Sequence, residues 1–193
     1  MKLIGSHLLN ILGKHQSSRI LDIGCGNGAL AGLLHASGYE VVGVDADSSG
    51  IDIARKAFPG VEFHQVLIGG ASTRFVSDVQ GTFDTIIATD VIEHLYRPSD
   101  LIDYASRLLS ANGRIVIGTP YHGYFKNLAL SFVNGWDRHW SPNWDGGHIK
   151  FFSRRTLTEL FYKQGYVMNE FVGAGRAPFL WHSMLLVFER SPK

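Results

Sequence analysis

The sequence is poor in cysteine, in net charge and in long apolar runs, and each shortage excludes a class of protein. Cys25 is the single cysteine among 193 residues, so the chain can form neither an internal disulfide nor a cysteine-rich zinc site. The formal net charge of +1 provides no field that would favour a nucleic acid or an anionic membrane surface. The apolar runs fall far short of the ~20 residues that cross a membrane as a helix.

The start of the chain also lacks the pattern of a secretory signal. Ile4, Leu8, Ile11 and Leu12 recur at helical spacing, with neither a continuous apolar run nor a small-residue cleavage site. We therefore predict an N-terminal helix over residues 1–15, a cytoplasmic location, no integral membrane association and no nucleic-acid partner. The sequence leaves the oligomeric state open.

What the sequence does contain is a regular alternation of strand and helix patterns. Helical patterns separate five β-rich runs, at 19–23, 40–44, 61–66, 83–88 and 113–118. Such alternation predicts parallel βαβ units around a central sheet. Two further strand candidates, 166–172 and 184–190, are expected to form an antiparallel hairpin at the sheet edge. With 45% hydrophobic residues, a chain of this length is expected to form one domain.

The first β-rich run leads into the turn Gly24-Cys25-Gly26-Asn27-Gly28, and a helical pattern follows at once. Glycine is needed where the chain turns with positive φ and where the backbone lies against a ligand. The N-terminus of the following helix would offer free N–H groups to a carboxylate or phosphate. Asp45 ends the second run, where a carboxylate can accept both hydroxyls of an adenosine ribose. Together, these features predict a nucleoside site.

The spacing of the glycines separates two cofactor classes. They fall at alternate positions, 24, 26 and 28, instead of the GxGxxG arrangement of dinucleotide binders. This favours a methionine-bearing nucleoside over NAD. A tight turn that binds nothing is the structural alternative, and the order of strand, turn, helix and distal acid argues against it.

Five stretches in this order resemble the class I S-adenosylmethionine-dependent methyltransferases: LDIGCGNG at 21–28, VGVD at 42–45, FDTII at 83–87, EHL at 93–95 and LSANGR at 109–114. Within that class, EHL and the later HIKFFS at 148–153 resemble the branch that includes ubiquinone-biosynthesis O-methyltransferases. The resemblance implies an α/β, Rossmann-like fold with helices on both faces of a seven-stranded, mostly parallel sheet. The implied strand order is 3-2-1-4-5-7-6, with only strand 7 antiparallel.

The resemblance also implies which residues would bind S-adenosylmethionine and its product S-adenosylhomocysteine. The methionine end would lie against Asp22, Gly24, Cys25, Gly26, Asn27 and Gly28. Asp45 would bind the ribose, and Ala46 would lie against the adenine. Many relatives carry an acid just after the third strand, whereas this chain has Leu67 and then Ile68, so adenine recognition would rest on backbone groups. Thr89 and Asp90 would border the sulfonium.

Methyl transfer from a sulfonium depends more on orientation than on acid–base chemistry, because the methyl group is already activated. Positioning supplies about 7 to 11 kcal/mol in favourable cases, whereas a general base supplies ~3 to 5 kcal/mol. His94 follows the fourth strand, at the sheet edge where ligands of open α/β sheets bind, and is the candidate general base. The alternative is that His94 has a structural role or lies against the cofactor instead of the acceptor. His148, His122 and His139 are further candidates, each with a structural alternative.

Residues 121–152 concentrate aromatic side chains and glycine, including three of the four tryptophans. We predict a lid or acceptor wall near the reactive end of the cofactor, because insertions after the fifth strand lie there in this topology; a satellite core is the alternative. The expected acceptor contacts are Tyr121, His122, Trp136, Trp140 and Trp144. Ser153 is expected to cap the next helix. The chain thus divides into an N-terminal helix (1–15), a cofactor-binding core (19–120), the aromatic segment (121–152) and a C-terminal helix with edge strands (153–193).

These features predict an enzyme that methylates a hydroxyl of a small aromatic, lipid-like or glycan acceptor. The alternatives are methylation of nitrogen or carbon, a non-catalytic regulatory protein that binds the cofactor, and a nicotinamide dehydrogenase, which the glycine spacing disfavours. A nucleic-acid methyltransferase is disfavoured by the lack of a basic stretch and of an Asn-Pro-Pro-Tyr site. No HxxxH or HExxH spacing occurs, so we predict no metal site. Lys150, Arg154 and Arg155 form either an anion contact or a solvated helix start.

Overall fold

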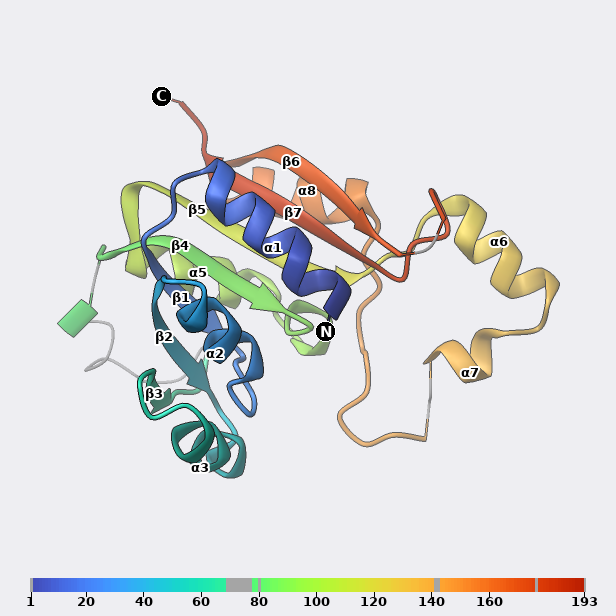
Figure 1. The fold of residues 1–193 in the computed structure, drawn as a ribbon. Helices are drawn as coiled ribbons and strands as arrows, with labels where there is room; N and C mark the ends of the chain where they lie inside the picture. Colours follow the sequence, from blue (N-terminus) through green and yellow to red (C-terminus); the bar gives the residue numbers. More distant parts are fainter. Residues whose placement is uncertain (1, 69–77, 80, 141–142, 176, 193) are drawn as a thin grey trace.

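The computed structural model describes residues 2–68, 78–79, 81–140, 143–175 and 177–192, and its centre is a seven-stranded sheet (Figure 1). The strands are β1 (Arg19–Ile23), β2 (Glu40–Asp45), β3 (Glu62–Gln65), β4 (Phe83–Thr89), β5 (Leu109–Pro120), β6 (Tyr166–Ala174) and β7 (Ser183–Arg190). Their order is β3-β2-β1-β4-β5-β7-β6. β7 alone runs opposite to the other six strands. The strand order and the fold class expected from the sequence motifs are confirmed.

Helices cover both faces of the sheet. In the described part of the chain the helices are α1 (Lys2–Lys14), α2 (Ala29–Ala36), α3 (Ser48–Ala57), the 3-10 helix η1 (Ile92–His94), α5 (Ser99–Leu108), α6 (Tyr124–Phe132), α7 (Trp136–Trp140) and α8 (Arg154–Tyr162). One apolar cluster packs α5 and α8 on the sheet through residues such as Leu108 and Phe161. A second cluster does the same for α1, α2 and α3 through Leu12, Leu34 and Ile51. Burial on both faces explains why the inner strands are apolar throughout.

Local sequence signals set several helix starts. The Ser153 hydroxyl accepts a hydrogen bond from the Thr156 amide, and the Thr156 hydroxyl accepts one from the Ser153 amide, which forms a reciprocal cap for α8. The expected capping role of Ser153 is confirmed. Pro98, with a φ of −60°, lies directly before α5 at its N-cap position. None of the helices in the described part of the chain is both long and apolar enough to cross a membrane.

The fifth strand is longer than its apolar run predicts. The sequence indicated a strand at 113–118, whereas β5 extends from Leu109 to Pro120. Its end gains a partner that lies far away in the sequence, because Thr119 and Pro120 pair with Met184 and Ser183 of β7. The pairing carries the chain to the carboxyl edge of the sheet before the aromatic segment begins. Figure 1 shows α6 and α7 projecting from the sheet beyond that edge.

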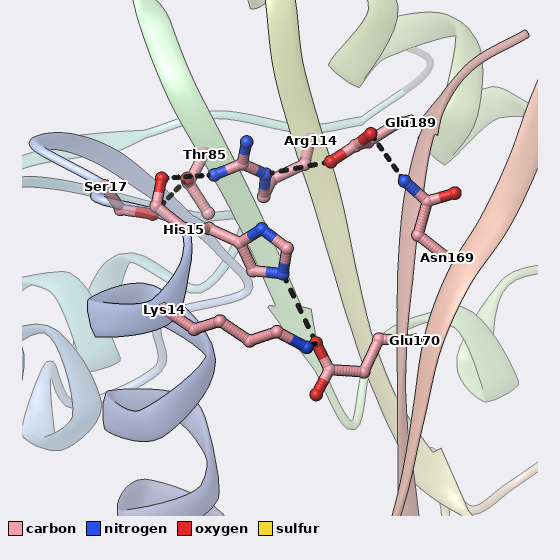
Figure 2. A network of polar contacts seen from close by, with 8 residues as sticks. All are labelled: Lys14, His15, Ser17, Thr85, Arg114, Asn169, Glu170 and Glu189. Atoms are coloured by element: carbon pink, nitrogen blue, oxygen red, sulfur yellow. Dashed lines mark hydrogen bonds and ion pairs between the residues drawn. The ribbon is translucent and has the colours of Figure 1, made fainter.

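A polar network fixes the end of α1 on the sheet (Figure 2). The Glu170 carboxylate on β6 accepts a hydrogen bond from Lys14 Nζ at 2.9 Å and lies 3.3 Å from His15 Nε2. Arg114 on β5 donates to the His15 carbonyl at 2.7 Å and to Glu189 at 3.3 Å. The hydrogen bond from Lys14 lowers the pKa of Glu170. With its end held in this way, α1 extends its first residues towards the turn that follows β1.

Removal of the Phe161 ring is expected to destabilise the fold strongly. The ring is fully buried and stacks on Phe188, with 3.8 Å between the ring centroids. We predict that Phe161→Ala lowers the free energy of unfolding by about 3 to 5 kcal/mol, because a large buried ring leaves a cavity. Urea denaturation measures the loss. Tyr162→Ala is the matched control, since Tyr162 on the same helix is 69% exposed; equal losses from the two substitutions would contradict this account of α8.

Candidate functional site

The turn after β1 requires glycine for two different reasons. Gly24, Gly26 and Gly28 all have positive φ, at 76°, 51° and 76°, which side chains other than glycine rarely adopt. A Cβ atom at Gly24 would also lie only 2.2 Å from Val91 Cγ2, whereas one at Gly26 would meet nothing within 4 Å. Gly24 is therefore required by packing as well as by φ. At Gly26 the positive φ alone requires glycine.

Asp45 connects this turn to the end of β2. Its Oδ2 atom accepts a hydrogen bond from the Gly26 amide at 2.8 Å, and its Oδ1 atom accepts one from the Asp47 amide at 2.9 Å. A carboxylate has about four acceptor positions, so two hydrogen bonds leave capacity for ligand hydroxyls. Asp47 in turn caps α3 by accepting from the Ser49 and Gly50 amides. The carboxylate of Asp45 thus organises the turn and remains able to bind a ligand.

Two adjacent cavities lie at this edge of the sheet and share Gly24 and Asp90 in their walls. The first, of about 420 Å³, is lined by Ile4, Gly5, Asp22, Gly24, Cys25, Asn27, Ala29, Leu30, Leu33, Thr89 and Asp90. The second, of about 230 Å³, is lined by Ile23, Gly24, Val44, Asp45, Ala46, Val66, Leu67, Ile68, Asp90, Val91, His94 and Leu95. Most residues expected at the cofactor therefore come together. Gly26 and Gly28 line neither cavity.

The first cavity also contains residues that the sequence reasoning missed. Ile4 and Gly5 reach it from α1, and Leu30 and Leu33 reach it from α2. Helical periodicity predicted that the N-terminal helix has an apolar face, but not that its first turn closes a cavity. The position of that first turn depends on the polar contacts of Lys14 and His15 at the other end of α1, because these contacts set the direction in which the helix runs.

Asp22 is a buried acid in the wall of the first cavity. Its side chain is 1% exposed, and Oδ2 has no hydrogen-bond partner among the described residues. Burial, assisted by the negative charge of Asp45, raises the pKa of Asp22 to about 7. A cationic group in the cavity would reverse this effect, because it stabilises the ionised carboxylate. The cavity therefore suits a ligand with a positive group.

His94, the candidate base, contacts Gly147, near the end of the aromatic segment. Its Nδ1 atom lies 3.2 Å from the Gly147 carbonyl, which can only accept a hydrogen bond. Nδ1 therefore carries the proton, and in the neutral ring Nε2 is left as the proton acceptor. The amides of Ile149 and Lys150 both donate to the Glu93 carbonyl at 3.0 Å. Residues 147–150 are thus anchored on η1.

Glu93, His94 and His148 form a compact polar group at the same place. Glu93 is 1% exposed; one carboxylate oxygen accepts from the Thr119 hydroxyl at 2.9 Å, and the other lies 3.9 Å from His148 Nε2. Burial raises the pKa of Glu93 to about 7. One potential metal-ligand atom from each of the three residues lies within 4.8 Å of the others. Sequence spacing could not reveal this group, because Glu93 and His148 are far apart in the chain; the predicted lack of a metal stays a prediction.

The structure separates the residues expected to contact the acceptor. Trp144 packs edge-on against the His94 ring, at 6.3 Å between centroids. Tyr121 is instead buried against Trp181. His122 and Trp136 line a third cavity rather than the first two. The side chain of Trp140 lies outside the described part of the structure.

The basic residues at the start of α8 do not converge on a ligand site. The Arg154 guanidinium lies over the Phe171 ring, 5.0 Å from its centroid. Arg155 pairs with Glu159 on the same helix at 3.6 Å, and both side chains are exposed. Lys150 contributes its amide to the Glu93 carbonyl. These contacts favour the interpretation of this group as a helix start.

Comparison with known proteins identifies relatives over most of the chain. A family model described as a methyltransferase domain matches residues 2–170. The chain is 30% identical over 172 residues to the ubiquinone biosynthesis O-methyltransferase of Bradyrhizobium diazoefficiens, which covers 89% of this chain and 66% of that protein. It is 29% identical over 166 residues to the enzyme of the same name from Nitrobacter winogradskyi, covering 83% of this chain and 61% of that protein. The chain thus spans less than two thirds of the length of these relatives.

Solved structures share the fold at low sequence identity. A protein of Pyrococcus horikoshii OT3 superposes with a TM-score of 0.73 at 21% identity, covering 98% of this chain and 89% of that one. Magnesium protoporphyrin IX methyltransferase from Synechocystis PCC 6803, crystallised with bound SAH, gives 0.71 at 16% identity and covers 97% and 82% of the two chains. These likenesses establish the architecture.

The buried acid Asp22 is expected to make stability depend on pH. Its pKa in the folded state, about 7, lies above the ordinary value of 3.8, so its contribution to stability is complete only below pH 3.8 and is lost progressively as the pH rises from there through 7. We predict that the melting temperature of Asp22→Asn increases relative to that of the wild type from pH 5 to pH 7, with little further increase at pH 8, in the absence of ligand. Each kcal/mol gained in the free energy of unfolding raises the melting temperature by about 2 to 4 °C in a chain of this size.

Thermal unfolding followed by circular dichroism from pH 5 to pH 8 measures this difference. Asp52→Asn is the control, because the Asp52 side chain is 68% exposed, and its difference from the wild type should stay constant with pH. A melting difference for Asp22→Asn that shrinks as the pH rises would contradict the assignment of Asp22 as a destabilised carboxylate.

Proposed function

The chain belongs to the methyltransferase-domain family whose model covers residues 2–170, and we propose that it transfers the methyl group of S-adenosylmethionine to a hydroxyl oxygen of a small acceptor. The acceptor is an aromatic, lipid-like or glycan molecule. Family membership agrees with the resemblance drawn from the motifs at 21–28, 42–45 and 93–95. An oxygen acceptor is supported by the relatives, which are named O-methyltransferases.

The observation that carries the proposal is the pair of adjacent cavities, each with one acid suited to one part of this cofactor. When bound, S-adenosylmethionine supplies a methyl carbon on a sulfonium, which is electrophilic without further activation. Asp22 presents an unpartnered carboxylate oxygen at the first cavity, which suits the ammonium of the amino-acid end. Asp45 keeps acceptor capacity at the second cavity, which suits ribose hydroxyls.

The walls of the second cavity also fit an adenine ring. Ala46, Leu67 and Ile68 line it together with Val66, so its surface offers apolar contact where many relatives place an acid. In this chain the adenine would therefore be held by packing and by backbone groups. Gly24 and the buried Cys25 line the first cavity, so at these two positions no exposed side chain blocks the amino-acid end.

His94 is the residue that we assign to proton transfer. It lines the second cavity beside Asp90, which borders both cavities, and the Gly147 carbonyl orients its ring. Nε2 of the neutral ring accepts the hydroxyl proton of the acceptor. The polar group formed with Glu93 and His148 then surrounds the imidazolium with one buried carboxylate and a second imidazole. The Glu93 carboxylate stabilises the charge that forms on His94.

A screen of acceptors tests the proposed reaction directly. Transfer of a labelled methyl group from S-adenosylmethionine is measured for matched phenols, catechols, sugars and amines. We expect turnover with hydroxyl acceptors. Transfer to amines alone, or binding of the cofactor with no turnover on any acceptor, would contradict the oxygen assignment.

Substitution of Asp45 is expected to weaken cofactor binding. Asp45→Ala removes the proposed ribose contacts and the acceptor for the Gly26 amide. Hydrogen bonds to a charged group contribute about 1.5 to 3 kcal/mol, so we predict that the Kd for S-adenosylhomocysteine rises by about 10- to 150-fold. Calorimetry measures the Kd, and Asp52→Ala, at an exposed position, is the control. Unchanged affinity in a folded Asp45→Ala protein would remove Asp45 from the ribose site.

Substitution of His94 is expected to separate turnover from binding. A general base contributes about 10²- to 10⁴-fold to a rate, so His94→Gln should lower kcat by about that factor. The Kd for S-adenosylhomocysteine should change by about twofold or less, since the assigned binding acids remain. His35→Gln, at an exposed position on α2, is the matched histidine control. A kcat equal to that of the wild type would rule out His94 as the base.

A further inference from the structure

The aromatic segment contains a buried lysine with no acidic partner. Lys126 lies on α6 and is only 8% exposed. Its Nζ atom donates to the His182 carbonyl at 3.3 Å, and no carboxylate among the described residues forms an ion pair with it. Lysine is almost never fully buried unless it is paired, because an uncompensated buried charge raises the free energy of the fold. Burial accordingly lowers the pKa of Lys126 to about 8.

The side chains around Lys126 are bases as well. His122 is 7% exposed, and its ring centroid lies 5.4 Å from that of His139 on α7. Burial, followed by the positive charge of Lys126, lowers the pKa of His122 to about 4, and His139 and His148 also contribute. Burial, Lys126 and His182 lower the pKa of His139 in the same way. This region therefore gathers nitrogen bases without a compensating negative charge.

Acids of the neighbouring elements do not supply that charge. Asp137, on α7 itself, is exposed. Glu93 is the buried acid of η1, and it is held by the Thr119 hydroxyl and lies near His148. A ligand anion would offset the mutual repulsion of Lys126, His122 and His139, and each of these side chains can donate a hydrogen bond to it.

A cavity of about 350 Å³ lies next to this group. It is lined by His122, Asn127, Trp136, Phe151, Ser153 and Thr156. Trp136 and Phe151 provide aromatic surface, and Ser153 and Thr156 mark the start of α8, whose helix dipole is positive at that end. Of the three bases, His122 lines the cavity itself, while Lys126 and His139 lie behind it, close enough to lower its pKa by their charge. Aromatic surface next to this group of bases suits a planar molecule that carries an acid group.

The cavity also lies at the edge of the sheet where the proposed reaction takes place. His122 comes two residues after the end of β5, and the Gly118 carbonyl of β5 accepts a hydrogen bond from the Asp90 amide at 2.9 Å. Asp90 borders both cofactor cavities. The basic cavity and the cofactor cavities are therefore built on the ends of neighbouring strands.

We propose that Lys126, His122 and His139 form an anion-binding subsite that holds the carboxylate or phosphate of the methyl acceptor. The inference rests on the proposed function, since it assigns this group to the acceptor. It narrows the acceptor to acidic molecules, with their aromatic or apolar body packed on Trp136 and Phe151. Lys126 acts in binding and has no part in the proton transfer assigned to His94.

The experiment measures anion binding and turnover separately. Inorganic phosphate and 4-hydroxybenzoate are titrated into the wild-type protein, and the His122 imidazole is followed by NMR over a range of pH. We expect either anion to raise the pKa of His122. The anion that binds more strongly shows whether the subsite prefers a carboxylate or a phosphate. A His122 pKa that neither anion moves at saturating concentration overturns the proposal without the use of any variant.

Variants then assign the effect to Lys126. Lys126→Gln should weaken binding of the preferred anion at least tenfold and raise the KM for 4-hydroxybenzoate by a similar factor. The KM for the neutral 4-hydroxybenzyl alcohol and the Kd for S-adenosylhomocysteine should stay unchanged. Lys126→Arg should restore most of the anion affinity, and Lys163→Gln, at an exposed position, is the control. Anion binding that is equal in Lys126→Gln and wild type overturns the proposal.

The two proposals fail in different ways. Anion binding that depends on Lys126, in a protein that methylates no acceptor, would contradict the proposed function and leave the anion site standing. Methylation of neutral and acidic acceptors with equal KM, together with an unshifted His122, would contradict the subsite and leave the methyltransferase assignment intact.

Discussion

The arrangement of the site depends on one carboxylate, that of Asp45, which holds two amides at the ends of two neighbouring strands. Its hydrogen bonds to Gly26 and Asp47 join the turn after β1 to the start of α3. The turn is thereby held in one conformation with three glycines at positive φ, one of several that glycine can adopt in the unfolded chain. Both cavities share a wall at Gly24, so the position of this turn decides the shape of each.

The second constraint is the way the aromatic segment returns to the sheet. Two amides donate to the Glu93 carbonyl, and the Gly147 carbonyl orients His94. Glu93 is in turn held by the hydroxyl of Thr119 on β5. Strands β4 and β5 and the aromatic segment are therefore connected through one short 3-10 helix. A change in the path of residues 147–150 would alter the orientation of the proposed base, and with it one wall of the second cavity.

Buried ionisable groups are concentrated at this one edge of the molecule. Asp22 and Glu93 have raised pKa values, and His122 and Lys126 have lowered ones, with desolvation as the largest cause in each case. Such groups reduce stability unless a ligand or a proton compensates them, and perturbed pKa values of this kind cluster at functional sites. Asp22 lines the first cavity and His122 lines the third, so each is placed where the proposed ligand would bring a charge of opposite sign.

The sequence by itself determined the fold class, the strand order through its resemblance, and most of the residues around the cofactor cavities. It could do so because glycine turns, apolar strands and an acid at a strand end are local requirements of the backbone. Only the tertiary structure brings Glu93 to His148, closes the first cavity with α1, and buries Lys126 with no ion-paired carboxylate among the described residues. These facts depend on pairing between distant segments, such as β5 with β7, and on burial, which local spacing does not encode.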